Sequence, residues 1–276
     1  MGKKILFISM IAVSLFIATS VFQTISAIDT NQLSENDITL VKNMIAKLEP
    51  YIAERKKNGD ANLLTFDDLY ARLEPREQSF MNEVRKLKPA PKAKNGNEIA
   101  DANFIEINDQ QLLIPDPSNA ERKFISVIER QYLPKHVFEA YKKMMEAMQK
   151  DLGKQLLIES GYRSPAYQLY LFVYYLKNHE YSIKETNRWV AFPGHSEHNR
   201  PEVQAIDFIN QEGISGENHP EDFENLEEYR WLTENAPKFG FVLSYPKNNA
   251  TNSAFEPWHW RYEGTVLLNP MEAKKL

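Results

Sequence analysis

Two short segments carry the residues best suited to chemistry. Residues 193–198 (PGHSEH) end in His198, and Asp207 follows nine positions later inside the apolar stretch 205–209 (AIDFI). Residues 256–262 (EPWHWRY) place His259 between two tryptophans. A carboxylate in an apolar strand is costly unless it is paired or binds a metal. Two histidines and one carboxylate are a frequent ligand set of catalytic zinc, which leaves one position open. These segments therefore indicate a Zn²⁺ site built from Asp207 and histidines of the two segments, with His195, His198 and His259 as the candidates. Taken singly, each residue has another interpretation, an Asp paired with Arg or Lys and a His packed in the core.

A second carboxylate, Glu256, stands three positions before His259. Zinc acidifies water, and a nearby carboxylate that does not bind the metal can take its proton. In a regular strand, side chains three positions apart point to opposite faces. Pro257 interrupts that regularity, so Glu256 and His259 can face one cavity. Glu256 is therefore the candidate general base.

The composition excludes several classes of protein. The chain has 276 residues, 42% of them hydrophobic, and a formal net charge of -5, which is ordinary for a globular protein and argues against nucleic-acid binding. The absence of Cys excludes disulfides, thiolate metal sites and catalytic thiols.

Residues 1–27 have the pattern of a secretory signal peptide. Lys3 and Lys4 precede the apolar run 5–22, and Ala27 is the expected cleavage site. The pattern predicts an exported bacterial protein in the periplasm or at the cell surface. Membrane contact is expected only through this segment, if it is not cleaved and stays as an anchor.

The remaining chain divides in two. Residues 28–97 are expected to form a helical segment and linker, with helices around 38–48 and 66–87 and a linker at 88–97 (KPAPKAKNGN). This segment has no chemical motif, so we expect it to be a spacer or a helical hairpin that is dispensable for chemistry. The alternative is a segment that binds the cell wall or a partner.

Residues 98–276 are expected to form the catalytic domain. The sequence patterns predict helices at 134–152, 165–176 and 223–239, and strands at 104–108, 155–159, 205–209, 241–245 and 258–262. Helices that precede a group of antiparallel strands favour an α+β fold, here a small antiparallel sheet with flanking helices that carries the zinc site.

Several motifs in this region resemble those of the VanY-type zinc D-alanyl-D-alanine carboxypeptidases of the M15 peptidase family. They are, in the family's order, 160–164 (SGYRS) with Gln168, 193–198 (PGHSEH), 205–207 (AID), 231–236 (WLTENA), 240–243 (GFVL) and 256–259 (EPWH). The resemblance implies a zinc hydrolase that removes the terminal D-Ala from peptidoglycan stem peptides.

The resemblance also implies roles for single residues. The ligands are His198, Asp207 and His259, and the catalytic base is Glu256. Arg163 matches an arginine that binds substrate or stabilises the oxyanion, and a guanidinium suits the substrate's free carboxylate. Ser196 and Gln168 are candidates for hydrogen bonds to substrate. The spacing from His198 to Asp207 is two positions longer than in the family pattern, which leaves the substrate preference open.

Three alternatives remain. Residues 244–247 (SYPK) fit the SxxK pattern of serine peptidases, although Pro246 opposes the helix that this motif needs. The domain could also bind cell wall without hydrolysis. Finally, LD-carboxypeptidases and DD-endopeptidases use the same zinc chemistry.

Overall fold

The computed structural model describes residues 28–87, 103–116, 119–249 and 253–264. The expected signal peptide and the linker 88–97 lie outside these ranges. Within them, none of the helices has the length and apolar character that crossing a membrane requires.

The first part of the chain is a helical unit. It consists of α1 (Glu35–Asn58), η1 (Ala61–Leu63), α2 (Phe66–Tyr70) and α3 (Pro75–Lys86). Ser34 caps the start of α1, and Gly59 ends it at a φ of 77°. The single helical stretch expected over 66–87 is divided, because Pro75 opens α3 and forces the preceding residue out of the helical conformation.

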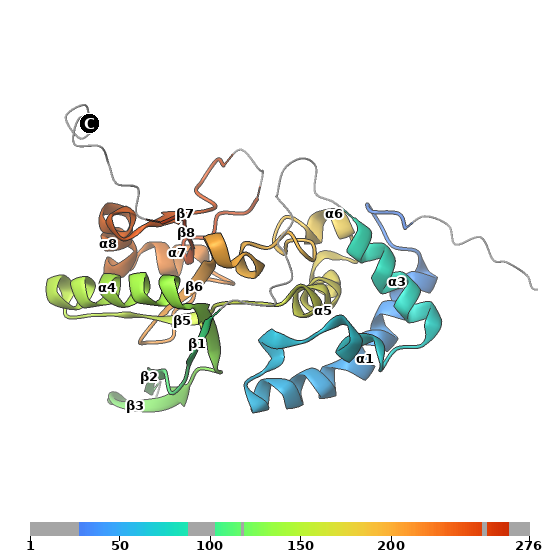
Figure 1. Ribbon diagram of the computed structural model, residues 1–276, viewed down its shortest axis with the longest axis horizontal. Helices are drawn as coiled ribbons and strands as arrows, with labels where there is room; N and C mark the ends of the chain where they lie inside the picture. The colour runs from blue at the N-terminus through green and yellow to red at the C-terminus, as the bar shows by residue number, and fades with distance from the viewer. Residues whose placement is uncertain (1–27, 88–102, 117–118, 250–252, 265–276) are drawn as a thin grey trace, which may run out of the picture.

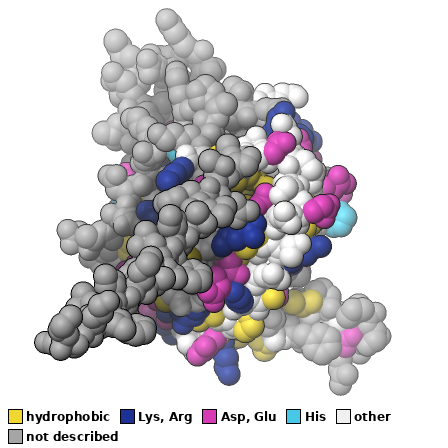
Figure 2. All heavy atoms as spheres, turned by 90° about the vertical axis from the view of Figure 1, so that its right-hand side faces the viewer, with side chains coloured by type: hydrophobic (Ala, Val, Ile, Leu, Met, Phe, Trp, Pro, Cys, Tyr) yellow, Lys and Arg dark blue, Asp and Glu magenta, His cyan; other side chains and the backbone are white. Residues whose placement is uncertain are grey.

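This helical unit packs on the rest of the molecule. One hydrophobic core joins residues of α1, α2 and α3 to α5 (Pro165–Tyr175) and α6 (Ile183–Thr186). Figure 1 shows α5 beside the helices of the unit. Figure 2 views the molecule from this side, and acidic and basic side chains lie interspersed where the described residues are visible.

The strands of the described residues form three antiparallel sheets. Strand β1 (Phe104–Ile107) pairs with β4 (Gln131–Pro134), and β2 (Gln111–Asp116) pairs with β3 (Asn119–Val127). The largest sheet has the order β5-β6-β8-β7, with β5 at Leu156–Ser160, β6 at Ala205–Asn210, β7 at Phe241–Leu243 and β8 at His259–Tyr262. The predicted α+β fold with a small antiparallel sheet is confirmed, and the β2–β3 hairpin was not anticipated.

A second hydrophobic core lies between this sheet and its helices. Helix α4 (Lys135–Leu152) contributes Met144, Met145 and Met148, and the sheet contributes Phe208 and Trp260. The helix expected over 223–239 is instead α7 (Pro220–Glu224), α8 (Glu227–Asn235) and η5 (Ala236–Phe239).

The free edge of β5 is occupied by a side chain. The Gln110 amide donates to the Ile158 carbonyl and accepts from the Ile158 N–H, both at 2.8 Å. A single side chain therefore makes the pair of hydrogen bonds that a neighbouring strand would make.

Candidate metal centre

The sheet brings Asp207 and His259 together. They face each other directly across the β6–β8 pair, and side chains opposite each other on antiparallel strands share a face. On the other side of β6, the register with β5 shifts between Ile158 and Ser160, so that Ser160 lies opposite Asp207. The loop after Ser160 therefore starts beside Asp207.

His198 reaches the same point from a loop. It lies in η3 (Glu197–Asn199), and a second short turn, η4 (Pro201–Val203), follows before Asp207. Ser196 caps η3 by accepting the His198 backbone N–H at 3.3 Å. The longer connection thus leaves His198 beside Asp207.

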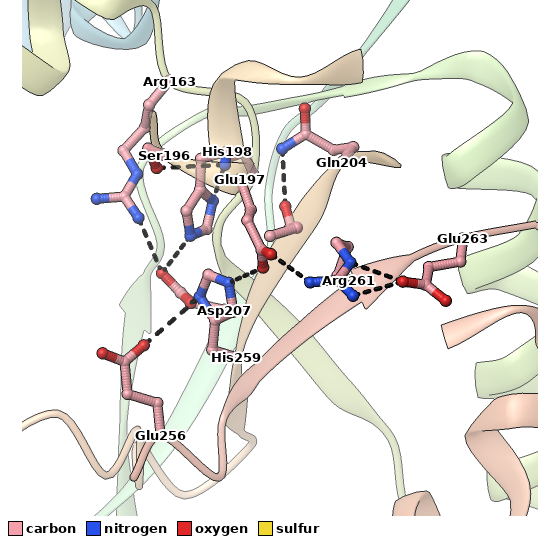
Figure 3. A network of polar contacts seen from close by, with 12 residues as sticks. Arg163, Ser196, Glu197, His198, Gln204, Asp207, Glu256, His259, Arg261 and Glu263 are labelled. Atoms are coloured by element: carbon pink, nitrogen blue, oxygen red, sulfur yellow. Dashed lines mark hydrogen bonds and ion pairs between the residues drawn. The ribbon is translucent and has the colours of Figure 1, made fainter. Parts of the chain in front are cut away.

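The three residues converge closely enough for one metal ion. One potential ligand atom from each of His198, Asp207 and His259 lies within 4.8 Å of the others. Figure 3 shows both imidazole rings turned toward the Asp207 carboxylate. His198 is almost fully buried, with 1% of its surface exposed.

The hydrogen bonds of His198 leave a lone pair facing the site. Its Nδ1 lies 2.7 Å from the Gly161 carbonyl, which can only accept, so Nδ1 carries the hydrogen and Nε2 does not. Nε2 lies 3.1 Å from Asp207 Oδ2, yet the two atoms form no hydrogen bond, because both are acceptors. Among the described residues, Nε2 has no other hydrogen-bond partner. Burial, with the nearby Arg163 charge, lowers the pKa of His198 to about 4 and keeps it neutral. A cation between the two acceptors would satisfy both, so this donor set fits a metal ion.

His259 is held from its other side by Glu197. Its Nδ1 lies 2.8 Å from Asp207 Oδ1, and its Nε2 lies 3.1 Å from Glu197 Oε2. Glu197 also accepts a hydrogen bond from Arg261, which in turn donates to Glu263 (Figure 3). A proton on Nε2 leaves Nδ1 available to a metal ion, and such carboxylate contacts orient metal-binding histidines.

The charges around His259 favour its protonated form when no metal is bound. Burial alone would lower the pKa of His259, but the carboxylates of Asp207, Glu197 and Glu256 raise it to about 10. Burial would raise the pKa of Glu197, but the contacts with His259 and Arg261 lower it to about 2. Glu197 therefore remains an anion at neutral pH.

Glu256 stands at the edge of the cluster. It precedes β8 in a turn closed by a hydrogen bond from the His259 N–H to the Glu256 carbonyl at 3.1 Å. Its Oε2 lies 3.7 Å from His259 Nδ1. This placement is what the turn at Pro257 led us to expect. Burial raises the pKa of Glu256 to about 8, and a neighbouring dication would favour its ionised form.

The three candidate substrate-binding residues differ in position. Arg163 is at the site, with Nη2 3.3 Å from Asp207 Oδ2, and Figure 3 shows its other terminal nitrogen pointing away from Asp207. Ser196 is buried and supports the His198 turn. Gln168 lies in α5, where its amide donates to the Ala191 carbonyl, and its buried Oε1 has no hydrogen-bond partner within the described part of the chain.

Glu197 and Arg261 were not predicted to lie at the site. Glu197 lies directly between the two candidate residues Ser196 and His198, and Arg261 lies two positions after His259, which puts both side chains on one face of β8. That period of two is the signal that could have revealed Arg261. The SxxK interpretation gains no support, because residues 244–247 are not helical and Lys247 pairs with Glu224.

Comparison with known proteins now identifies the family. The model for VanY, D-alanyl-D-alanine carboxypeptidase, matches residues 130–265. A putative carboxypeptidase of Bacillus subtilis, YodJ, is 30% identical over 201 residues, which cover 68% of each chain. The chain belongs to the VanY family of D-alanyl-D-alanine carboxypeptidases.

Other VanY-type proteins match shorter stretches. A D-alanyl-D-alanine carboxypeptidase of Enterococcus faecalis is 37% identical over 123 residues, 41% of each chain. The solved structure of VanYB in complex with D-alanine-D-alanine has 27% identity and a TM-score of 0.41, over 49% of this chain and 74% of that chain. The match to the family model begins at residue 130, after the N-terminal helical unit.

Proposed function

We propose that this protein is a zinc-dependent carboxypeptidase that hydrolyses the terminal D-Ala-D-Ala bond of peptidoglycan stem peptides. The observation that carries the proposal is the pair of acceptors, His198 Nε2 and Asp207 Oδ2, that face each other at 3.1 Å beside His259. Membership of the VanY family supports the substrate class. Export to the periplasm or cell surface, proposed from residues 1–27, agrees with a cell-wall substrate.

His198, Asp207 and His259 would hold the metal. When bound, zinc supplies a Lewis acid that acidifies water and polarises the scissile carbonyl. His198 would bind the metal as a neutral imidazole through Nε2, and Asp207 would supply the negative charge. The Gly161 carbonyl fixes the first ring and the Glu197 carboxylate fixes the second.

Glu256 moves the proton. Its carboxylate takes a proton from the attacking water and delivers it to the nitrogen of the leaving D-alanine. Its buried position lets it hold that proton between the two steps, because burial favours the neutral acid. The same residue therefore acts first as base and then as acid.

Arg163 binds the free carboxylate of the terminal D-alanine. The nitrogen that points away from Asp207 is free to form a charge-assisted hydrogen bond. Ser196 and Gln168 stay candidates for hydrogen bonds to the peptide, although both side chains are buried.

Incubation of the purified protein with defined muropeptides tests this function. With zinc, mass spectrometry should show stem pentapeptides losing one terminal alanine, and a chelator or the substitution Glu256→Gln should prevent it. Loss of the fourth residue from tetrapeptides, or cleavage of crosslinks, would identify the LD-carboxypeptidase or endopeptidase alternative. Bound zinc with no cleavage of any stem peptide would instead indicate a binding module.

A further inference from the structure

The N-terminal helical unit is bonded directly to the loop that carries Arg163. The backbone N–H of Ser164 donates to the Asn62 carbonyl at 2.9 Å, and its hydroxyl donates to the Leu64 carbonyl at 2.6 Å. Ser164 is 7% exposed and also caps α5. The turn 61–64 of the unit therefore holds the last residue of the 160–164 motif.

Gln131 of β4 makes a second connection between the helical unit and this loop. Its Oε1 accepts the Asn62 amide at 3.3 Å and the Gly161 N–H at 3.0 Å. Tyr132 also connects the unit to the loop, because its hydroxyl donates to the Gly59 carbonyl and its own carbonyl accepts the Tyr162 N–H at 2.7 Å. Both ends of residues 161–164 are thus tied to the helical unit.

The 161–164 loop is in turn hydrogen-bonded to the candidate metal centre. The Gly161 carbonyl accepts from His198 Nδ1, and the Arg163 N–H donates to the His198 carbonyl at 3.1 Å. The fit is close, because a Cβ at Gly161 would lie 2.5 Å from the Tyr132 carbonyl oxygen. A shift of this loop would therefore move His198 and Arg163 together.

We infer that the N-terminal helical unit positions the metal centre: Asn62, with the carbonyls of residues 62 and 64, fixes the 161–164 loop, and the loop orients His198 and Arg163. The unit is then a working part of the site, in contrast to the expectation that residues 28–97 are dispensable. The effect on turnover rests on the proposed carboxypeptidase function, whereas the effect on metal binding does not. Asn62 and Gln131 are positioning residues.

A double-mutant cycle in the full-length protein tests the inference. Asn62→Ala, Gln131→Ala and the double variant are compared for zinc dissociation constant, for the visible absorption of the Co²⁺-loaded protein, and for kcat and KM on a stem pentapeptide. Asn82→Ala is the matched control, because Asn82 is also half-buried and accepts a hydrogen bond, from Tyr70, inside the same unit.

We expect Gln131→Ala to weaken zinc binding and lower kcat by roughly tenfold, the lower end for residues that orient metal ligands. Asn62→Ala should have a smaller effect in the same direction. The double variant should be no worse than Gln131→Ala, since Asn62 acts through Gln131. Asn82→Ala should change neither the Co²⁺ spectrum nor kcat.

Three results would overturn the inference. The first is that Asn62→Ala keeps the zinc affinity, Co²⁺ spectrum and kcat of the wild type. The second is that the losses of the two single variants multiply in the double variant, and the third is that Asn82→Ala loses as much as Asn62→Ala. If Asn62→Ala does not fold, Ser164→Ala and its control Ser182→Ala decide in the same way. Both serines are 7% exposed and cap helices, but Ser182 caps α6 and makes no bond to residues 61–64. If the wild type cleaves no stem peptide, the proposed function fails, and zinc affinity and the Co²⁺ spectrum still decide the inference.

Discussion

The contact between Glu197 and His259 gives the most discriminating prediction about the metal centre. The substitution Glu197→Gln keeps an oxygen that can accept from His259 Nε2, but it removes the charge. It also turns an amide group toward Arg261, which keeps its ion pair with Glu263. The fold should survive, because the shape of the side chain is unchanged.

The expected loss follows from the hydrogen bonds. A bond to a charged group contributes about 1.5–3 kcal/mol and a neutral one about 0.5–1.5 kcal/mol. Because the Glu197 side chain is only 12% exposed, solvent does little to weaken the difference. A loss of about 1.4 kcal/mol corresponds to a tenfold rise in the zinc dissociation constant, and residues that orient metal ligands typically account for about 10- to 100-fold.

The assay is competition for zinc against a chelator of known affinity, followed by metal analysis of the dialysed protein. Glu263→Gln is the control, because Glu263 binds the same arginine but does not touch His259, and its side chain is 43% exposed. An exposed pair of this kind contributes about 0–1 kcal/mol. Equal zinc affinity in Glu197→Gln and wild type, or an equal loss in both variants, would refute the orienting role.

Four further predictions concern the same site. His259→Ala should abolish metal binding and activity together, as measured by metal analysis and peptide hydrolysis. Glu256→Gln should keep its zinc but lower kcat by roughly 10²–10⁴, and near-normal turnover would remove Glu256 from the mechanism. Arg163→Ala should raise KM for the peptide as well as lower kcat, unlike Glu256→Gln, and an unchanged KM would argue against carboxylate binding. Zinc binding at pH 7 should release at least one proton, because the metal-free protein raises the pKa of His259 to about 10 and the metal must displace the Nδ1 hydrogen. Zinc affinity should therefore rise with pH up to that value. Calorimetry in buffers of different ionisation enthalpy measures the release, and a buffer-independent enthalpy would contradict it.

The regular elements were the most predictable part of the fold. Helix α4 follows its apolar period, and β6 and β8 coincide with the apolar runs around Asp207 and His259. The predictions failed where an expected helix is interrupted locally. Pro75 divided one expected helix, and the stretch 223–239 became three short elements, with Pro237 in the last of them, where a proline cannot continue an α-helix.

The candidate site, like the fold, could be predicted only in part from the sequence. His198, Asp207 and His259 could be proposed from residue type and motif order, because each lies in a short recognisable segment. Asn62 and Gln131 could not, since each is an ordinary polar residue whose partner lies far away in the sequence, 69 positions for this pair. The packing of the helical unit against α5 brings Asn62 to the loop before Ser164, where Gln131 of β4 also lies.

The Gln110 amide on Ile158 also affects how the protein behaves at high concentration. An unpaired strand edge is a template for another chain, and edge-to-edge pairing leads to aggregation. In the four-stranded sheet, Gln110 fills the hydrogen-bonding positions of Ile158 at one edge, and β7 at the other edge is only three residues long. Among the described residues, neither side offers a long run of free peptide groups, so the sheet resists growth by addition of strands. Gln110→Ala would reopen one side, and the first consequence would be self-association of the folded protein.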